Sequence, residues 1–324
     1  MAIFKNLHDP GLGEKFLTGN RRIINKDGSF NVKRIGLDSV GKNLYYYLIN
    51  ISWLKFLGLM FGSYVLINIA FALIYTALGV GHLQGADMET PFSQFMSALF
   101  FSFQTFTSVG YGAIAPKGMM VSLVSSAEAF VGLSSFALLT GLIFARFARP
   151  SSKILFSENA LISPYRDGLT SLQFRIANRR HNVLMELEAK VMLMAKDKYD
   201  PSRRIYYSLP LETAYIHFFP LNWTLVHPIN DESPLMGMSA KEMQQLDIEI
   251  LILIKGFDDT FGQVVYTRYS YKFNEIVHNA KFRKAYDTDE HGVTVMDINN
   301  IHAYDLLEAN VEVKENQSAA AVAS

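Results

Sequence analysis

Two long uncharged stretches constrain the fold of this chain more than any other feature of its sequence. No residue between Phe56 and Val80 is charged, and Glu128 is the only charged residue between Met119 and Ala145. A helix needs roughly 20 apolar residues to cross a bilayer, and both stretches exceed that length. Buried helices of soluble domains are rarely so long and so free of charge. The sequence therefore predicts two transmembrane helices.

Charged residues are concentrated outside these stretches. The formal net charge of the 324 residues is zero, so no global charge favours nucleic acid as a partner. Lys and Arg are frequent before Phe56 and after Ala145, whereas the segment between the two stretches contains only Lys117. The positive-inside rule then predicts a multi-pass protein with both termini in the cytoplasm. Residues 1–20 lack an apolar core and a small-residue cleavage site, so no signal peptide is expected.

The segment between the two stretches is expected to enter the membrane and leave on the same side. Residues 92–106 (FSQFMSALFFSFQTF) are too apolar for a loop in water, yet a helix of that length reaches only about 22 Å. Pro91 suits the first turn of a helix. The negative charges of Asp87 and Glu89 would interact favourably with the positive, N-terminal end of the helix dipole. We therefore predict a re-entrant pore helix at 92–106.

The segment that follows this helix and returns to the same side of the membrane has the sequence TSVGYG at 107–112. Non-helical backbone at membrane depth is tolerated only inside protein or beside a water-filled path. Glycine adopts backbone angles that other residues avoid, and alternating angles can point successive carbonyls at one axis. The segment resembles the TVGYG filter of potassium channels, in which carbonyl oxygens replace the hydration shell of K⁺. The expected filter consists of Thr107, Ser108, Val109, Gly110, Tyr111 and Gly112. K⁺ would be bound by the backbone carbonyls of Ser108, Val109, Gly110 and Tyr111.

Further stretches extend the resemblance to one family. ARFARP at 145–150, ILFSENA at 154–160, NWTLVHPINDESPLMG at 222–237 and RYSYKFNEI at 268–276 are similar to stretches of the inward-rectifier potassium channels, most closely their prokaryotic branch. The order of these motifs agrees throughout. The resemblance implies a homotetramer around one pore in the prokaryotic inner membrane, because one chain offers only one carbonyl per level of a ring. It also implies an immunoglobulin-like β-sandwich in the cytoplasm.

The expected fold class is thus a membrane protein with α and β parts: two transmembrane helices with a re-entrant pore helix and filter, and a cytoplasmic β-sandwich. The expected parts are an N-terminal cytoplasmic arm at 1–36, an interfacial slide helix at 37–52, a pore domain at 53–149 with its filter at 108–112, a regulatory β-sandwich at 150–309 and a disordered tail at 310–324. Apolar residues recur at helical spacing in the slide helix segment. An extension of the first transmembrane helix would give the same periodicity.

The pattern of the sequence changes after residue 150. Apolar residues alternate with polar ones over 183–193, as in a half-buried strand, and 248–254 and 263–271 are also predicted strands. There is no G-x-G-x-x-G fingerprint, no nucleophile elbow, no cysteine and no histidine pair at metal-ligand spacing. We expect neither enzyme chemistry nor a cofactor, with K⁺ only as the permeant ion.

The resemblance implies roles for residues around the filter. Ser108 stands where the family usually has threonine, so the loop should be looser, with potassium selectivity kept or reduced. Gln104 occupies a place behind the filter that often holds an acid. Glu128 would brace the filter through hydrogen bonds to nearby backbone or hydroxyl groups, although an ion-facing position is the alternative.

The second transmembrane helix carries the expected cavity and gate. Phe136, Thr140 and Phe144 are four residues apart and share one helix face, which the resemblance places on the cavity. Phe144 matches a bulky gate where four rings could dewet the pore, and Phe136 replaces an acid of strong rectifiers, so weak polyamine block is expected. Without the resemblance, these rings could equally face lipid or protein. Glu186 and Asp259 match acids of the cytoplasmic pore, or belong to ordinary solvated surface.

Basic residues follow the second helix. Arg146, Arg149 and Lys153 would each gain about 1 kcal/mol near anionic lipid, although they could serve only to set the topology. In the family the first two positions help bind phosphoinositide headgroups, which open eukaryotic relatives and tend to close prokaryotic ones. Gly132 and Gly141 are expected to be either hinges or close-packing sites.

Three other functions are compatible with parts of the sequence. A two-helix channel with a nucleotide- or calcium-binding domain would need a dinucleotide fingerprint and alternating strands and helices, which are absent. A membrane-anchored sensor that conducts nothing would not need the filter glycines. A poorly selective cation channel is supported by Ser108 and Gln104.

Overall fold

The computed structural model describes residues 6–7, 9–13, 22–33, 35, 44–148 and 153–307. The chain forms two compact units, which we describe separately. Residues 34–149 form the first, here called the pore unit, and residues 1–33 together with 150–324 form the second, here called the β unit. The expected tail at 310–324 and most of the first half of the expected slide helix lie outside the described residues.

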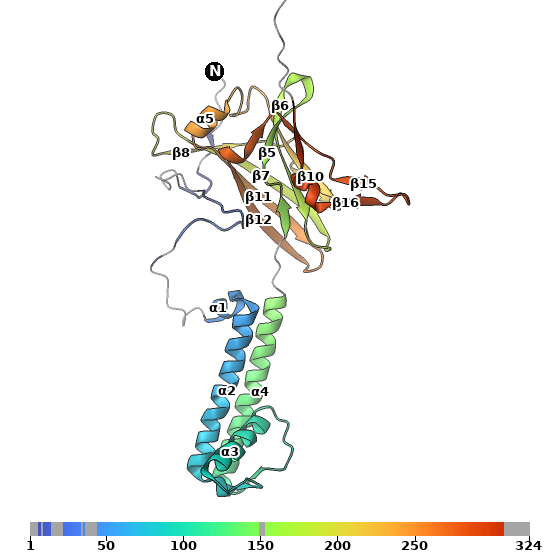
Figure 1. The fold of residues 1–324 in the computed structure, drawn as a ribbon. Coiled ribbons are helices and arrows are strands. Elements are labelled where there is room, and N and C mark those ends of the chain that lie inside the picture. The colour runs from blue at the N-terminus through green and yellow to red at the C-terminus, as the bar shows by residue number, and fades with distance from the viewer. Residues whose placement is uncertain are drawn as a thin grey trace, which may run out of the picture. The chain divides into compact units, whose positions relative to one another are not determined.

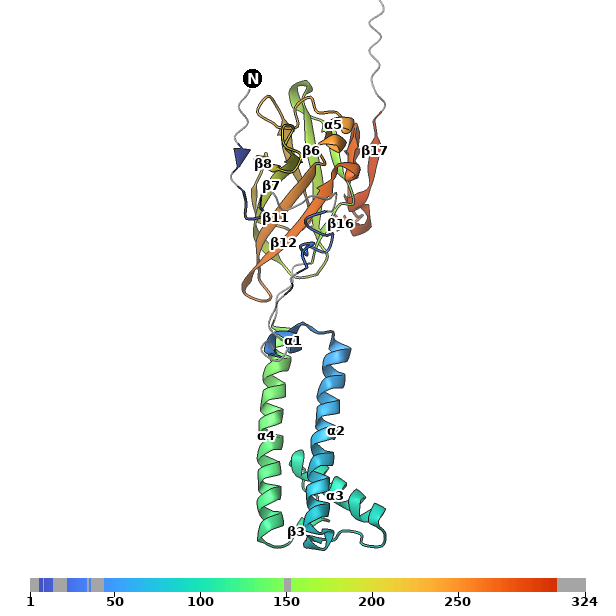
Figure 2. The same ribbon diagram turned by 90° about the vertical axis from the view of Figure 1, so that its left-hand side faces the viewer.

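Two long helices running in opposite directions frame the pore unit (Figures 1 and 2). Helix α2 spans Trp53–Leu78 and helix α4 spans Met119–Phe147, and both are long and apolar enough to cross a membrane. Many of their large apolar side chains are exposed in the single chain. Helix α1 (Leu44–Asn50) is separate from α2, because the chain leaves the helical path at Ser52.

A shorter helix, α3 (Pro91–Phe106), packs against both long helices. Their shared core contains Tyr75 from α2, Ala98 and Phe101 from α3, and Val121 from α4. A 3-10 turn, η2 (Val80–His82), leads into strand β2 (Leu83–Gln84), which pairs with β3 (Ala115–Pro116). This pairing ties together the start and the end of the segment between the long helices.

The β unit is a two-layer sandwich, and its strands follow the alternation of apolar residues in the sequence. The larger sheet contains β1 (Asn6–Leu7), β7 (Leu184–Lys196), β8 (Arg204–Ser208), β9 (Tyr215–Phe218), β11 (Glu249–Asp258) and β12 (Gln263–Lys272). The second contains β4 (Ile154–Phe156), β5 (Ala160–Pro164), β6 (Thr170–Asn178), β10 (Asn222–Ile229) and β13 (Ile276–His278). The strands predicted at 183–193, 248–254 and 263–271 are confirmed as β7, β11 and β12.

Short elements complete the β unit. Two pairs of strands lie outside the main sheets: β14 (Ala280–Phe282) with β17 (Tyr304–Leu306), and β15 (Tyr286–Thr288) with β16 (Thr294–Met296). Its short helices are η3 (Arg166–Gly168), α5 (Ala240–Gln245), η4 (Phe273–Glu275) and η5 (Ile298–His302). The core between the sheets is formed by side chains such as Phe174, Ile176, Leu193, Ile252 and Tyr271.

A segment of the N-terminal arm lies against the outside of the larger sheet. Ile23 and Ile24 pack with Met194, Tyr206 and Leu251. The buried carboxylate of Glu249 accepts hydrogen bonds from the amides of both isoleucines. Part of the arm is therefore an integral part of the β unit.

Candidate functional site

The pore helix α3 begins with a complete cap. The Thr90 hydroxyl accepts the Ser93 amide hydrogen bond at 3.0 Å, and the Ser93 hydroxyl accepts that of Thr90 at 3.0 Å. Pro91 follows as the first helical residue, where its missing N–H costs nothing. The helix ends at Phe106, directly before the predicted filter.

The first residues of the predicted filter use their N–H groups to bind the end of α3. Thr107 N donates to Phe103 O, and Ser108 N donates to Thr105 O, both at 3.1 Å. Val109 N and Gly110 N both donate to the carbonyl of Gln104, at 3.1 and 3.4 Å. Gln104 thus supports this segment through its main chain.

The backbone of residues 108–112 alternates in conformation. Ser108, Gly110 and Gly112 have positive φ angles of 57°, 53° and 81°, whereas the intervening Val109 and Tyr111 do not. Among the hydrogen bonds of the described residues, none uses the carbonyl oxygen of residues 108–111. Ser108 adopts its positive φ without being glycine, at a cost of about 1 kcal/mol or more. The N–H groups of residues 107–110 are therefore hydrogen-bonded, whereas the carbonyls of residues 108–111 are free.

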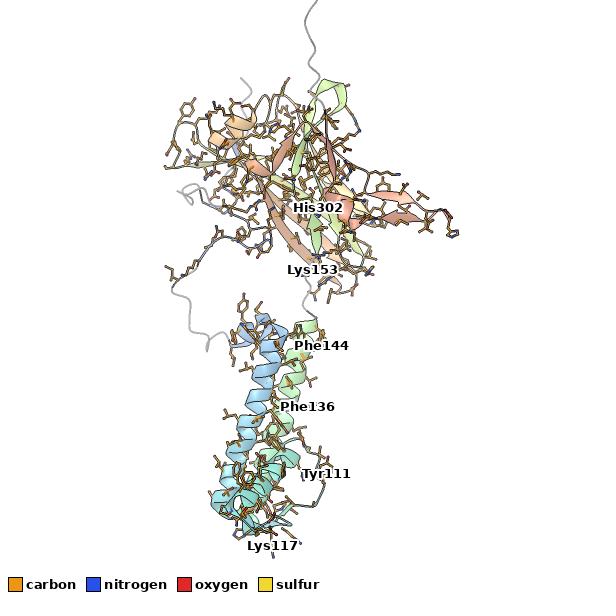
Figure 3. All side chains as sticks on the ribbon, viewed as in Figure 1. Tyr111, Lys117, Phe136, Phe144, Lys153 and His302 are labelled. Carbon is orange, nitrogen blue, oxygen red and sulfur yellow. The ribbon has the colours of Figure 1, made fainter. Side chains whose placement is uncertain are left out.

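Two filter side chains are uncovered in the single chain. Val109 is 54% exposed and Tyr111 is 78% exposed. In Figure 3, Tyr111 lies in the loop that follows α3, and Phe136 and Phe144 lie along α4. Phe136 and Phe144 are 69% and 72% exposed. The side chains of Val109, Tyr111, Phe136 and Phe144 can therefore contact molecules other than this chain.

The α4 face expected to line a cavity borders a hollow. Thr140 lies on the same face, and its hydroxyl donates to the carbonyl of Phe136 at 2.9 Å. A hollow of about 670 Å³ lies between α2 and α4 and reaches Thr107 and Ser108. Phe136 is among its lining residues, whereas Phe144 is farther along α4.

Glu128 is fully buried between the three helices. Its Oε2 accepts a hydrogen bond from the Tyr75 hydroxyl at 2.5 Å, and its Oε1 is hydrogen-bonded to the Ser102 hydroxyl. Ser102 immediately precedes Phe103, Gln104 and Thr105, whose carbonyls bind the filter amides. The carboxyl group is therefore linked to the end of the pore helix.

The family of the chain follows from comparison with known proteins. A model of the inward rectifier potassium channel C-terminal domain matches residues 154–321, and an ion channel model matches residues 61–149. The inward rectifier potassium channel Kirbac3.1 of Paramagnetospirillum magnetotacticum is 33% identical over 285 residues, which cover 87% of this chain and 95% of that protein. The chain belongs to the inward-rectifier potassium channel family.

More distant relatives of this inward-rectifier chain come from animals. The ATP-sensitive inward rectifier potassium channel 12 of Bos taurus is 26% identical over 285 residues, covering 81% of this chain and 66% of that protein. The inward rectifier potassium channel 18 of Homo sapiens is 26% identical over the same length, covering 81% and 65%. These relatives are ion channels and not enzymes. They confirm the prediction of a channel rather than an enzyme, and they confirm the predicted inward-rectifier family.

The two acids that the inward-rectifier resemblance assigned to a cytoplasmic pore lie at one end of the larger sheet. Glu186 occupies a bulge of β7, where its φ angle is 51° and the pairing with β11 shifts register. Asp259 follows β11, and its amide donates to the carbonyl of Val183 at 3.2 Å, just before β7. Both side chains are exposed.

The basic residues of this inward-rectifier chain differ in their surroundings. Arg146 is half-buried; its Nη2 donates to Ile51 O at 2.7 Å, and its Nη1 donates to Leu48 O. Lys153 is exposed in the β unit. Arg149 lies outside the described residues.

Some residues near the filter cannot be recognised from the sequence. Tyr75 and Ser102, which bind Glu128, are a phenol and a hydroxyl within apolar helices and carry no distinguishing pattern. The sequence is compatible with either a hinge or a close-packing site at Gly132. A Cβ atom there would lie 2.0 Å from Phe106 O, whereas one at Gly141 would meet nothing within 4 Å. Gly132 is therefore a close-packing site against the end of the pore helix.

Proposed function

We propose that this chain is a potassium-selective channel that conducts passively through a homotetrameric pore. The observation that carries the proposal is the alternating backbone of residues 108–112 with its free carbonyls, an arrangement suited to replacing the water around K⁺. One chain supplies one oxygen per level, so a ring requires symmetric copies. The exposure of Val109 and Tyr111 supports the same assembly, since neighbouring subunits would cover them.

Ions would leave the filter through a cavity and a gate on α4. We assign the gate to Phe144, because four exposed rings at one level can close a pore by dewetting. Phe136 offers no charge to a blocking polyamine, so rectification from the cavity should be weak. Beyond the gate, the exposed carboxylates of Glu186 and Asp259 would attract cations.

The proposed location is the prokaryotic inner membrane, with both termini in the cytoplasm and with anionic or phosphoinositide lipids as regulators. The distribution of Lys and Arg supports this orientation. Lys153, which is exposed, and Arg149 remain the proposed lipid-binding residues. Arg146 donates hydrogen bonds from both terminal nitrogens to the main-chain carbonyls of Leu48 and Ile51, so we assign it the role of holding the end of α4 to the segment between α1 and α2.

Rubidium uptake into liposomes, with sodium and barium as competitors, tests the proposal. Gly110→Ala should abolish uptake, because a left-handed φ costs a residue with a side chain about 1–2 kcal/mol in each copy. Gly58→Ala is the matched control, since Gly58 lies in regular α2 with nothing within 4 Å of a Cβ. Uptake indifferent to Gly110→Ala would contradict the channel function. Equal uptake of sodium would instead indicate a poorly selective cation channel, which Ser108 favours.

A further inference from the structure

A buried polar cluster behind the filter joins all three long elements of the pore unit. It contains Asn68 and Tyr75 of α2, Ser102 of α3 and Glu128 of α4, each 1% exposed or less. Tyr75 and Ser102 contact one carboxyl oxygen of Glu128 each. The Ser102 hydroxyl oxygen also lies 2.9 Å from Oδ1 and 3.1 Å from the main-chain oxygen of Asn68.

The orientation of the Asn68 amide follows from its other contact. Its Nδ2 lies 2.8 Å from the carbonyl oxygen of Tyr64, one turn earlier in α2. A carbonyl oxygen can only accept, so the nitrogen must face it, and Oδ1 must face Ser102. Ser102 is therefore surrounded by oxygen atoms of Asn68 and Glu128.

The number of protons in the cluster then decides the state of Glu128. A serine hydroxyl carries one proton and can donate only one hydrogen bond. If Glu128 were ionised, its Oε1 and the two oxygen atoms of Asn68 would compete for that one proton, and at least one contact would be between two lone pairs. If Glu128 is a carboxylic acid, it donates to Ser102, and Ser102 donates its own proton to Asn68, whose Oδ1 and main-chain oxygen share it. Each of the three contacts of the Ser102 hydroxyl then involves a proton.

The electrostatic surroundings agree with the neutral acid. Lys117 is the only Lys or Arg between Phe56 and Ala145, and it precedes α4. Glu128 lies roughly 14 Å along that helix from its first residue. No basic side chain of the described residues forms an ion pair with Glu128. A carboxylate buried at membrane depth without a cation is costly.

We propose that Glu128 is held as a neutral carboxylic acid whose proton completes a one-way chain of hydrogen bonds, from Tyr75 through Glu128 and Ser102 to Asn68. The chain fixes the last turn and a half of α3 between α2 and α4. Since the carbonyls of Phe103, Gln104 and Thr105 bind the filter amides, Glu128 is a positioning residue for the filter. In this respect the inference rests on the proposed function.

Infrared difference spectra of the full chain in lipid vesicles test the proton directly. At neutral pH, wild type minus Glu128→Gln should contain the C=O stretch of a carboxylic acid. Tyr75→Phe should move that band to higher wavenumber, because the carbonyl oxygen loses its donor. Glu89→Gln is the matched control, since Glu89 is exposed and should give carboxylate bands only. Carboxylate bands alone from Glu128 would overturn the inference.

Rubidium uptake tests the positioning role. Glu128→Gln should keep the wild-type uptake and selectivity, because the amide of the new side chain offers an N–H to Ser102 and a carbonyl to Tyr75. Glu128→Ala leaves both partners unsatisfied and should lose uptake. Equal loss in both variants would show that the charge is needed and would contradict the neutral acid. Absent uptake in the wild type would refute the proposed function alone, because the infrared bands do not depend on conduction.

Discussion

The Nη2 atom of Arg146 donates a hydrogen bond to the carbonyl of Ile51 at 2.7 Å. Its Nη1 donates to the carbonyl of Leu48, and the guanidinium lies 4.6 Å from the Trp53 ring centroid and 4.5 Å from that of Phe56. One side chain thus ties the end of α4 to the corner between α1 and α2. Movement of α1 would be transmitted to the helix end that carries Phe144.

Replacing Arg146 by lysine separates this tie from the charge. Lysine keeps the positive charge, but its ammonium group lacks the planar fork that reaches two carbonyls and stacks on rings. Each charged hydrogen bond contributes about 1.5–3 kcal/mol. We expect Arg146→Lys to blunt the effect of phosphoinositide on rubidium uptake as strongly as Arg146→Ala.

Lys153→Arg serves as the control for this experiment, because it keeps the charge at an exposed position. Its response to phosphoinositide should equal that of the wild type. A normal response in Arg146→Lys, with loss only in Arg146→Ala, would mean that the charge alone matters.

Phe144→Ala should raise rubidium uptake. If four Phe144 rings close the pore by dewetting, four methyl groups leave it wide enough to stay wet. Phe147→Ala is the matched control, because the centroid of the Phe147 ring lies 4.9 Å from that of Trp53, the first residue of α2. Unchanged uptake in Phe144→Ala would place this ring against lipid or protein and remove it as the gate.

The parts that sequence predicted well are those set by local patterns. The lengths of α2 and α4 follow from uncharged stretches, α3 begins at the proline expected in its first turn, and β7 follows the alternation of its side chains. The partners of Glu128 were not predictable, because Tyr75 and Ser102 meet it only after three helices pack. Gly132 and Gly141 likewise look alike in sequence, and only the approach of Phe106 distinguishes them.

Asp247→Asn should destabilise the β unit strongly. Its carboxylate is 3% exposed, lies 2.8 Å from Nη2 of Arg204, which is itself 2% exposed, and lies 3.0 Å from Nζ of Lys272. Removing one partner of a buried ion pair leaves the other charge uncompensated, at a cost of about 3–5 kcal/mol. Urea denaturation monitored through Trp223, with Trp53 replaced by Phe, would measure the loss.

The contribution of Asp247 to the stability of the β unit depends on pH in a defined direction. Burial tends to raise the pKa of Asp247, but the hydrogen bonds from Arg204 and Lys272 outweigh burial and hold its pKa below the ordinary 3.8. Its contribution is therefore present above pH 3.8 and is lost as the pH falls through the lower pKa of the folded state. Asp247→Asn should flatten the acid side of the stability profile.

Asp305→Asn is the control for the buried pair. Asp305 binds Arg283 at the surface, where such pairs contribute about 0–1 kcal/mol. A loss of stability as small in Asp247→Asn as in Asp305→Asn would mean that the buried cluster does not hold the sandwich together.

Gly132→Ala should impair the channel, although it changes one hydrogen into a methyl group. The new Cβ would lie 2.0 Å from Phe106 O, so α4 or the end of the pore helix must shift, typically at a cost of about 1–3 kcal/mol. Because the filter begins at the next residue, we expect reduced rubidium uptake and weaker discrimination against sodium. Gly141→Ala is the matched control in the same helix: nothing lies within 4 Å of its Cβ, and alanine favours a helix by about 1 kcal/mol. If Gly132 were instead a bending point, Gly132→Ala would slow opening but leave selectivity intact.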